Sequence, residues 1–450
     1  MNVEQTTLPK KYHDAVLHWQ RHNFPDYGLL PENWQKYFPS DPEFCLCAKM
    51  EVGMGETIEV GDHKGEKRRE TPDQLGEEPA KHLLAIIRAQ ASTEFGSIQQ
   101  HEGTLARAQD EEDKIWVLRV MAEELRHGYQ MLHLLVSQDW SHVSGQKAEE
   151  MVEEILSMKT GSHVLDAFNV EYDSFVDNVV FAAVIDRVGK YQLSMQRVCS
   201  YKPFAASMPP RLREEAFHLA AGVVPLRRWV QRAAEGNALI TMSAIQKAFN
   251  KWMPRGLEMF GHEKGGDSNV RFGFKNLKNA EAQNQYFDEC VRMVADLNQR
   301  YIRARLPQLS PQGAEDLAER LIRDGVRHDG ISAADLLRIP DMRFFRRKGE
   351  PAFTMVGTRG EIFEDAEEYS RHLAANLPDA YLHSRDMKQY VETLRQVSSG
   401  QITVDQAIKK MPTLKRVGGV CPCSRSVRWV VEEPRTADAA SAADSAAPAA

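Results

Sequence analysis

A short motif, Glu-x-x-His, occurs twice in this chain, as Glu124-Leu-Arg-His127 and as Glu215-Ala-Phe-His218. Each copy lies in a long stretch whose apolar residues recur with helical periodicity. Residues three apart are neighbours on one face of a helix, so each pair can direct a carboxylate and an imidazole at one ion. A single copy is weak evidence, because helices are rich in Glu. Two copies on two long helices restrict the fold much more strongly.

Both motifs fall on apolar helical faces. The apolar residues that flank them are Val117, Val120, Met121, Met131, Leu134 and Leu135 for the first copy, and Leu212, Leu219 and Gly222 for the second. Burying a carboxylate without a partner costs several kcal/mol, and Glu is rarely buried unless it is paired. We therefore expect cations beside Glu124 and Glu215.

Two further acids lie on apolar faces of long predicted helices. Glu94 follows Leu83, Ile87 and Ala91, and Asp186 follows Val176, Val179 and Ala183. The chain order is then carboxylate, motif, carboxylate, motif, which is typical of ferritin-like di-iron and di-manganese bundles. The sequence predicts a dinuclear metal site with the ligands Glu94, Glu124, His127, Asp186, Glu215 and His218.

Simpler interpretations exist for each ligand taken alone. Glu94 or Asp186 would more often pair with a nearby arginine, and Arg88 and Arg187 are available. A lone histidine on an apolar face is more often a hydrogen-bonded core residue than a metal ligand. The joint pattern on four helices favours the metal site.

Four other acids and histidines lie near the motifs. Glu123 and Glu214 precede the proposed ligands and are rotated off the ligand face, so we expect them to be solvated or to lie behind the ligands. His101 and His133 could compete as ligands, but neither has an acid three residues earlier.

Carboxylates with two imidazoles and no thiolate suit iron or manganese better than zinc or copper(I). Iron is preferred here because a pair of redox-active ions can activate O2. Three functions remain open: oxidation of an organic substrate, ferroxidase or storage chemistry, and a bundle that has lost catalysis and serves as a scaffold. A chain of 450 residues is much longer than a minimal bundle requires, which favours the first.

Hydrophobic periodicity predicts a mainly α fold, and the order of candidate ligands on four of its helices predicts a ferritin-like four-helix bundle. We expect a mixed cap over residues 1–78 with a β-meander at 44–64, the bundle over 79–260, a helical extension over 261–435 with a hairpin at 344–363, and a disordered tail over 436–450. Pro209-Pro210 is expected to begin a helix, because proline is tolerated in a first turn. The predicted helices cover residues 79–101, 111–138, 146–158, 172–201, 209–233, 238–260, 281–305, 312–324, 366–375 and 385–411.

Composition places the chain with soluble globular proteins, since 42% of its residues are hydrophobic and 27% are charged. A net charge of −7 is mild for this length and gives no reason to expect nucleic acid or a membrane as a partner. No apolar run approaches the ~20 residues that a membrane span needs. The polar N-terminus lacks the apolar stretch of a secretion signal, so a cytoplasmic protein is expected.

Six cysteines in so long a chain do not make a disulfide framework. Two close pairs, Cys45-Leu-Cys47 and Cys421-Pro-Cys423, are spaced more tightly than is usual for structural zinc. We expect ordinary reduced thiols at these positions.

Several segments resemble the oxygenase components of the benzoyl-CoA 2,3-epoxidase family, which is related to the catalytic subunit of phenylacetyl-CoA epoxidase. The resemblance extends from about residue 40 to 390, and the ligand-bearing motifs are its most specific part. The segments that carry it are 86–101, 122–135, 164–193 and 214–222, with 60–65, 257–277 and 345–373 beyond the bundle.

This resemblance implies a di-iron enzyme that inserts one oxygen atom of O2 into an aromatic acyl-CoA such as benzoyl-CoA, by epoxidation or hydroxylation. Electrons would come from NADPH through a separate flavin and iron–sulfur reductase, and a homodimer is possible. The family's ligands match the same six positions, Glu94, Glu124, His127, Asp186, Glu215 and His218. Residues 306–343 and the segment after Pro412 depart from the family, so a relative that acts on another acyl-CoA stays open.

One basic cluster could meet the phosphates of a CoA tail. It consists of Arg343, Arg346, Arg347 and Lys348, beside Phe344 and Phe345. A charge run of this kind is more often a solvated face. The chain has no glycine-rich phosphate loop, so we do not expect it to bind NADPH or ATP itself.

Overall fold

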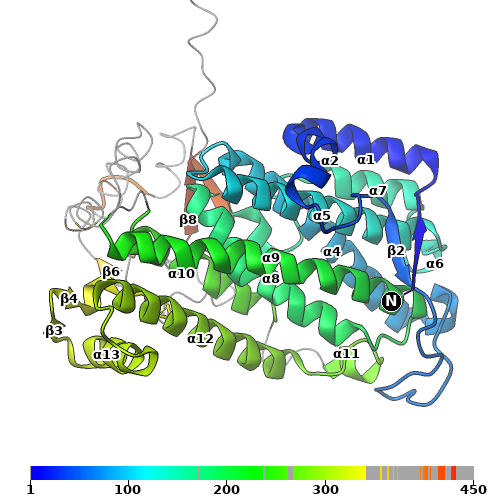
Figure 1. Ribbon diagram of the computed structural model, residues 1–450. Coiled ribbons are helices and arrows are strands. Elements are labelled where there is room, and N and C mark those ends of the chain that lie inside the picture. The colour runs from blue at the N-terminus through cyan, green and yellow to red at the C-terminus, as the bar shows by residue number, and fades with distance from the viewer. Residues whose placement is uncertain are drawn as a thin grey trace, which may run out of the picture.

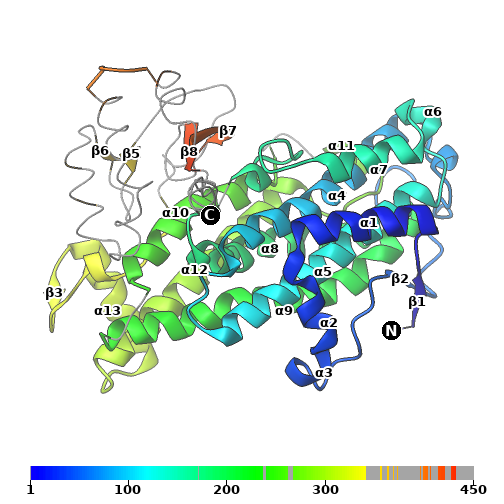
Figure 2. The same cartoon turned by 90° about the horizontal axis from the view of Figure 1, so that it is seen from above.

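Four long helices form the centre of the molecule, as the computed structural model shows (Figures 1 and 2). They are α4 (Glu77–Leu105), α5 (Glu111–Val136), α8 (Phe175–Gln196) and α9 (Lys202–Ala234). Helix α4 packs on α5 and α8 packs on α9, and the two pairs meet through contacts of α5 with α9 and of α4 with α8. The predicted mainly α, ferritin-like bundle is confirmed.

The structure describes residues 2–170, 172–236, 240–261 and 267–340, and beyond these only short pieces. Those pieces are residues 355–356, 362–363, 368, 372, 396, 399–403, 406, 414–420 and 427–431. No described helix is both long enough and apolar enough to cross a membrane.

Shorter helices surround the bundle. Helix α1 contacts α4 and α7, α10 packs on α8, and α12 packs on α9 and carries α13. Helix α1 and the short helices after it were not predicted. The other α-helices whose bounds the structure describes are α1 (Lys10–Asn23), α2 (Leu29–Glu32), α3 (Trp34–Tyr37), α6 (Ser141–Ser144), α7 (Ala148–Ser157), α10 (Met242–Glu258), α11 (Asp267–Arg271), α12 (Asn279–Arg305) and α13 (Pro311–Asp324).

Helix ends follow local sequence signals. Ser174 caps α8, because its side chain accepts from the backbone N–H of Val176, and the Asp177 carboxylate accepts from the Ser174 N–H at 3.0 Å. This reciprocal arrangement satisfies two donors that a helix start otherwise leaves unpaired. It fixes the start of the helix that carries Asp186.

The predicted start of one helix is wrong. Helix α9 begins at Lys202, with Pro203 in its first turn, so Pro209 and Pro210 lie inside the helix. Both of these prolines are buried, and their packing offsets the backbone hydrogen bonds that they cannot donate.

Helices α8 and α9 approach each other closely at Gly222. A Cβ atom at this position would lie 2.2 Å from the backbone nitrogen of Ala183, so no larger residue fits. Gly222 lies one turn after His218, and Ala183 lies one turn before Asp186. The close contact therefore sets the distance between His218 and Asp186.

The N-terminal sheet is small, as predicted, but its pairing differs from the expected meander. Strand β2 (Ala48–Glu51) pairs antiparallel with β1 (Val3–Thr6), and residues 52–64 contribute only an isolated bridge between Thr57 and Lys67. Gly53, Gly61 and Gly65 have φ between 83° and 90°, which interrupts extended backbone. Three more antiparallel pairs are described: β3 (Arg327–His328) with β4 (Ile331–Ser332), β5 (Met355–Val356) with β6 (Ile362–Phe363), and β7 (Leu414–Val420) with β8 (Val427–Val431).

Several predictions concern parts of the chain outside the described residues. Strands β5 and β6 fall within the predicted hairpin at 344–363, and the rest of that hairpin is not described. The same holds for almost all of the predicted helices at 366–375 and 385–411, for the tail at 436–450, for Cys421 and Cys423, and for the basic cluster Arg343, Arg346, Arg347 and Lys348.

The expectation of reduced thiols is wrong for one pair. Cys45 and Cys47 form a disulfide. With one residue between them, their Cα atoms lie 5.5 Å apart, a usual separation for bonded cysteines. Cys199 and Cys290 are free and buried.

Candidate metal centre

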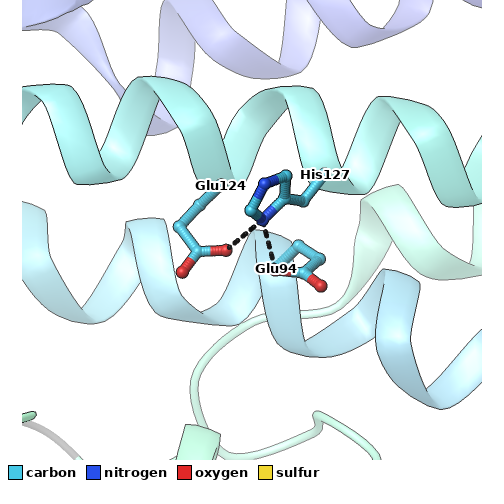
Figure 3. A group of neighbouring side chains, drawn as sticks. All are labelled: Glu94, Glu124 and His127. Carbon is cyan, nitrogen blue, oxygen red and sulfur yellow. Dashed lines mark ion pairs between the residues drawn. The ribbon is translucent and has the colours of Figure 1, made fainter. Parts of the chain in front are cut away.

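All six predicted ligands lie inside the four-helix bundle, and each is less than a tenth exposed. They form two groups: Glu94, Glu124 and His127, drawn in Figure 3, and Glu124, Asp186 and His218. Within each group the ligand atoms lie within 4.8 Å of one another. Glu124 belongs to both groups, while Glu215 approaches the second through His218.

The two imidazoles present the same nitrogen to the shared carboxylate. Nδ1 of His127 lies 3.4 Å from Oε2 of Glu124 and 3.8 Å from Oε2 of Glu94. Nδ1 of His218 lies 3.5 Å from Oε1 of Glu124 and 3.6 Å from Oε2 of Glu215. Glu124 therefore presents one carboxylate oxygen to each imidazole.

A carboxylate of the opposite helix holds the outer nitrogen of each imidazole. Nε2 of His127 lies 3.0 Å from Oε2 of Glu214 on α9, and Nε2 of His218 lies 3.2 Å from Oε2 of Glu123 on α5. When Nε2–H donates to the acid, Nδ1 is left as an acceptor for a metal, an arrangement common at metal-binding histidines. Glu123 and Glu214 were expected either to be solvated or to lie behind the candidate ligands, and the structure supports the second position.

Basic residues balance these two acids. Arg126 places Nη2 2.8 Å from Oε1 of Glu214, and Lys49 Nζ lies 3.2 Å from the same oxygen. Arg119 donates from Nε to Oε1 of Glu123 at 3.1 Å. Burial alone would raise the pKa of Glu214, but Arg126 and the hydrogen bond from His127 hold that pKa well below its usual range. Glu214 therefore stays an anion behind the imidazole.

The inward-facing ligand atoms lack hydrogen-bond partners. Within the described part of the chain, this holds for Oε2 of Glu124, Nδ1 of His127, Oδ2 of Asp186, Oε2 of Glu215 and Nδ1 of His218, all of them buried. Buried polar atoms are nearly always hydrogen-bonded. Five buried acceptor atoms without hydrogen-bond partners at one place in the core are the kind of atoms that coordinate metal ions.

The electrostatics of the site also favour cations. Burial and the neighbouring carboxylates, Glu94 first among them, raise the pKa of Glu124 well above its ordinary value. Burial likewise raises the pKa of Asp186, and the attraction of His218 only partly opposes the effect. Divalent ions would neutralise this excess of carboxylates and let them ionise.

Glu94 has a buried cation as its partner. Arg211 of α9 donates from Nη2 to Oε1 of Glu94, which leaves Oε2 on the side of His127. Arg211 lies one turn before Glu215 on the same face of α9, and this spacing is the signal that could have revealed it. The two arginines considered from the sequence, Arg88 and Arg187, pair instead with Glu154 and Glu289.

The two background histidines stay outside the ligand groups. Nδ1 of His101 lies 3.0 Å from Nδ2 of Asn178, and burial lowers the pKa of His101 to about 3. His133 belongs to neither cluster of potential ligands found among the described residues.

A cavity of about 220 Å³ adjoins the candidate centre. Four of the proposed ligands line it, and helix α8 leaves room for it at Gly189, where a Cβ atom would lie 2.9 Å from Oε1 of Glu215. The ligands that line it are Glu94, Glu124, Asp186 and Glu215, and its apolar wall includes Ile86, Leu165, Phe168, Leu193 and Met259. The cavity can hold a small apolar group against the centre.

Comparison with known proteins gives two matches. The family described as phenylacetic acid catabolic protein matches residues 54–308, which is more than half of the chain and contains all six proposed ligands. Benzoyl-CoA oxygenase component B of Aromatoleum evansii is 30% identical over 185 residues. That match covers 40% of this chain and 37% of the relative, so it spans little more than a third of that protein's length. The resemblance inferred from the motifs is confirmed, and the chain belongs to the phenylacetic acid catabolic protein family.

Proposed function

We propose that this chain is the oxygenase component of a di-iron monooxygenase that epoxidises an aromatic acyl-CoA such as benzoyl-CoA. The single observation that carries the proposal is the set of five buried acceptor atoms, on Glu124 and its neighbours, that have no hydrogen-bond partner, together with an acid behind each imidazole. The six residues Glu94, Glu124, His127, Asp186, Glu215 and His218 would hold the two ions. Carboxylates with two imidazoles suit iron.

When bound, the ferrous pair supplies the chemistry that divides O2 between the aromatic ring and a molecule of water. The overall reaction consumes two electrons and two protons besides the substrate and O2. NADPH would supply the electrons through a separate flavin and iron–sulfur reductase, since the sequence contains no glycine-rich phosphate-binding motif. The name of the relative from Aromatoleum evansii, an oxygenase component, supports a division of work between chains.

The residues of this chain orient and insulate the centre. Glu123 and Glu214 fix the ring orientation of the two histidines, and Arg211 restrains one oxygen of Glu94. The apolar residues of the cavity wall would limit the water that reaches the face where the substrate would lie. A cavity beside the candidate centre, lined by both apolar and polar residues, supports substrate oxidation over iron storage, which needs no such chamber.

The test is metal content by elemental analysis of the aerobically purified protein. About two irons per chain are expected for a dinuclear site, and the double variant Glu124→Ala/His218→Ala should lose them. A matched control, Glu319→Ala/His328→Ala, removes the same residue types from exposed positions and should keep the iron. Purified protein with benzoyl-CoA, O2, NADPH and a reductase should then form the ring epoxide.

Two results would contradict the proposal. A protein that stays free of iron after anaerobic reconstitution with ferrous ions has no di-iron centre. A protein that binds two irons and reduces O2, but leaves benzoyl-CoA and other aromatic acyl-CoA thioesters unchanged, has a different substrate class.

A further inference from the structure

A buried lysine lies on the wall of the cavity beside the candidate centre. Lys275 follows α11 in the loop that leads to α12, and only 6% of its surface is exposed. Its Nζ donates to Oε1 of Gln192 at 2.7 Å and lies 3.4 Å from Oδ1 of Asn279. Both partners are neutral amides, so neither neutralises the amine.

Charge makes this arrangement unusual. Among the described residues Lys275 has no carboxylate partner within ion-pair distance, and burial lowers its pKa to about 8. At neutral pH the amine is still mostly protonated. An ammonium group has three donors, and the two amides accept from two of them. A buried charge with a remaining donor is costly unless an acceptor is supplied, and a ligand in the cavity can supply one.

The loop that carries Lys275 is held in place before it reaches the cavity. Ser200 donates from its backbone N to the carbonyl of Gly273 at 2.8 Å and from its hydroxyl to the carbonyl of Phe272 at 2.7 Å. Gly273 has φ of 72°, and a Cβ atom there would lie 2.9 Å from the carbonyl oxygen of Val60. The amine is therefore presented from a fixed backbone, which lowers the entropic cost of binding.

The hydrogen bond to Gln192 places the amine beside α8, and this position determines which part of a bound substrate the amine can contact. Gln192 lies six residues after Asp186, which corresponds to about 9 Å along the helix axis at 1.5 Å per residue. Lys275 therefore contacts the cavity at a distance from the ligands, where the arm of a substrate would lie if its reacting ring were at the centre.

The cavity is large enough for only part of an acyl-CoA molecule. Pockets that enclose drug-sized ligands measure about 300–1,000 Å³, and this cavity measures about 220 Å³. It can take an aromatic acyl group and the start of its thioester arm, but the nucleotide and phosphates must stay outside. The acceptors on the part that enters are carbonyl oxygens.

We propose that Lys275 is a substrate-binding residue that donates a hydrogen bond to a carbonyl oxygen on the thioester arm of the substrate. This inference rests on the proposed function, because it takes the substrate to be an acyl thioester. The bond would anchor the arm between Gln192 and Asn279 and set how far the acyl group reaches toward Glu124 and Asp186.

The test is calorimetric binding to the iron-loaded protein without a reductase, so that no turnover occurs. The probes are benzoyl-CoA and S-benzoyl-N-acetylcysteamine, which keeps the carbonyl oxygens but lacks the phosphates. Lys275→Met should weaken the binding of both probes by roughly 10- to 100-fold, the range for a hydrogen bond to a charged group. Lys278→Met is the matched control, since Lys278 is exposed and pairs with Asp267, and it should bind like the wild type.

Three results would overturn the inference. Equal affinities of wild type and Lys275→Met would show that the amine makes no contact with the substrate. A loss for benzoyl-CoA alone would assign the amine to a phosphate. An equal loss of affinity in Lys278→Met would show that a general loss of positive charge, and not contact with Lys275, weakens binding.

Failure of the proposed function would look different. Wild-type protein with a full complement of iron that binds neither thioester has another substrate class, whatever the variants do. The iron content of each variant is measured alongside, so that a loss of binding is not confused with a loss of the centre.

Discussion

Oε2 of Glu214 on α9 lies 3.0 Å from Nε2 of His127 on α5, and Glu123 on α5 holds His218 on α9 in the same way at 3.2 Å. Each Glu-Glu-x-x-His segment therefore provides one candidate ligand acid, one candidate ligand imidazole and one acid that supports the imidazole of the other helix. The two helices position each other's histidines. This relation makes the metal site and the α5–α9 interface interdependent.

Glu214→Gln tests that relation. Glutamine keeps the size of the side chain but removes the negative charge that orients and polarises His127. Loss of such a partner typically weakens metal binding by 10- to 100-fold. Glu123→Gln should have a similar effect through His218. The measurement is iron affinity by competition with a chelator of known affinity.

The control for this prediction is Glu149→Gln, which alters an exposed glutamate that pairs with Lys11 far from the ligands. It should bind iron like the wild type. If both core variants also kept wild-type affinity, the two acids would serve only to neutralise Arg126 and its neighbours.

The candidate ligands were accessible from the sequence because a buried acid on an apolar helical face needs a cation. The six residues were found in this way, and the structure brings all of them to one place. Arg211 was missed, since its pairing with Glu94 crosses from α9 to α4 and nothing in the local pattern of α4 points to it. The sequence did not decide whether Glu123 and Glu214 are solvated or lie behind the candidate ligands. The apolar pattern of one helix shows which of its residues face inward, but it does not show which helix packs against them.

Three other predictions were wrong for different reasons. The β-meander was predicted from alternation in residues 44–64, but β2 finds its partner in residues 3–6. The disulfide of Cys45 and Cys47 was not expected, because spacing alone does not show whether two thiols are bonded. Pro209-Pro210 was misplaced because a proline pair can be tolerated within a helix when it is buried.

Gly189→Ala should damage the metal site without damaging the helix. A Cβ atom at Gly189 would lie 2.9 Å from Oε1 of Glu215, so that carboxylate must move. Alanine is otherwise the better helix former, by about 1 kcal/mol. We expect lower iron affinity together with an unchanged or slightly higher free energy of unfolding for the metal-free protein.

Gly103→Ala is the matched control for Gly189→Ala, since Gly103 lies in helix α4 and a Cβ atom added there would have no neighbouring atom within 4 Å. It should stabilise the protein slightly and leave iron affinity unchanged. Equal iron affinity in both variants would show that Glu215 can adjust freely.

Gly222→Ala should destabilise the fold itself. The added methyl group would lie 2.2 Å from the backbone nitrogen of Ala183, and backbone atoms cannot move aside as a flexible side chain does. Overpacking of this kind costs about 1–3 kcal/mol, which exceeds the gain in helix propensity. Urea denaturation should show the loss in the metal-free protein, and a variant as stable as the wild type would mean that α8 and α9 can separate at little cost.

Glu102 on α4 should make stability depend on pH. Burial raises its pKa to about 7, Asp26 adds to the effect and Lys114 opposes it, and Oε2 of Glu102 has no hydrogen-bond partner among the described residues. A carboxyl whose pKa is higher in the folded state than its usual 4.5 favours the fold in its protonated form. This contribution is complete below about pH 4.5 and is lost as the pH rises through about 7.

Glu102→Gln should therefore raise the thermal unfolding temperature at pH 8 and change it little at pH 4.5, because glutamine resembles the protonated acid at every pH. The gain should be a few degrees at most, since the side chain is only about half buried and solvent screens the charge. Glu153→Gln, at an exposed position on α7, controls for the change in net charge. A variant that is no more stable than the wild type at pH 8 would show that the ionised carboxylate of Glu102 finds a partner or reaches solvent.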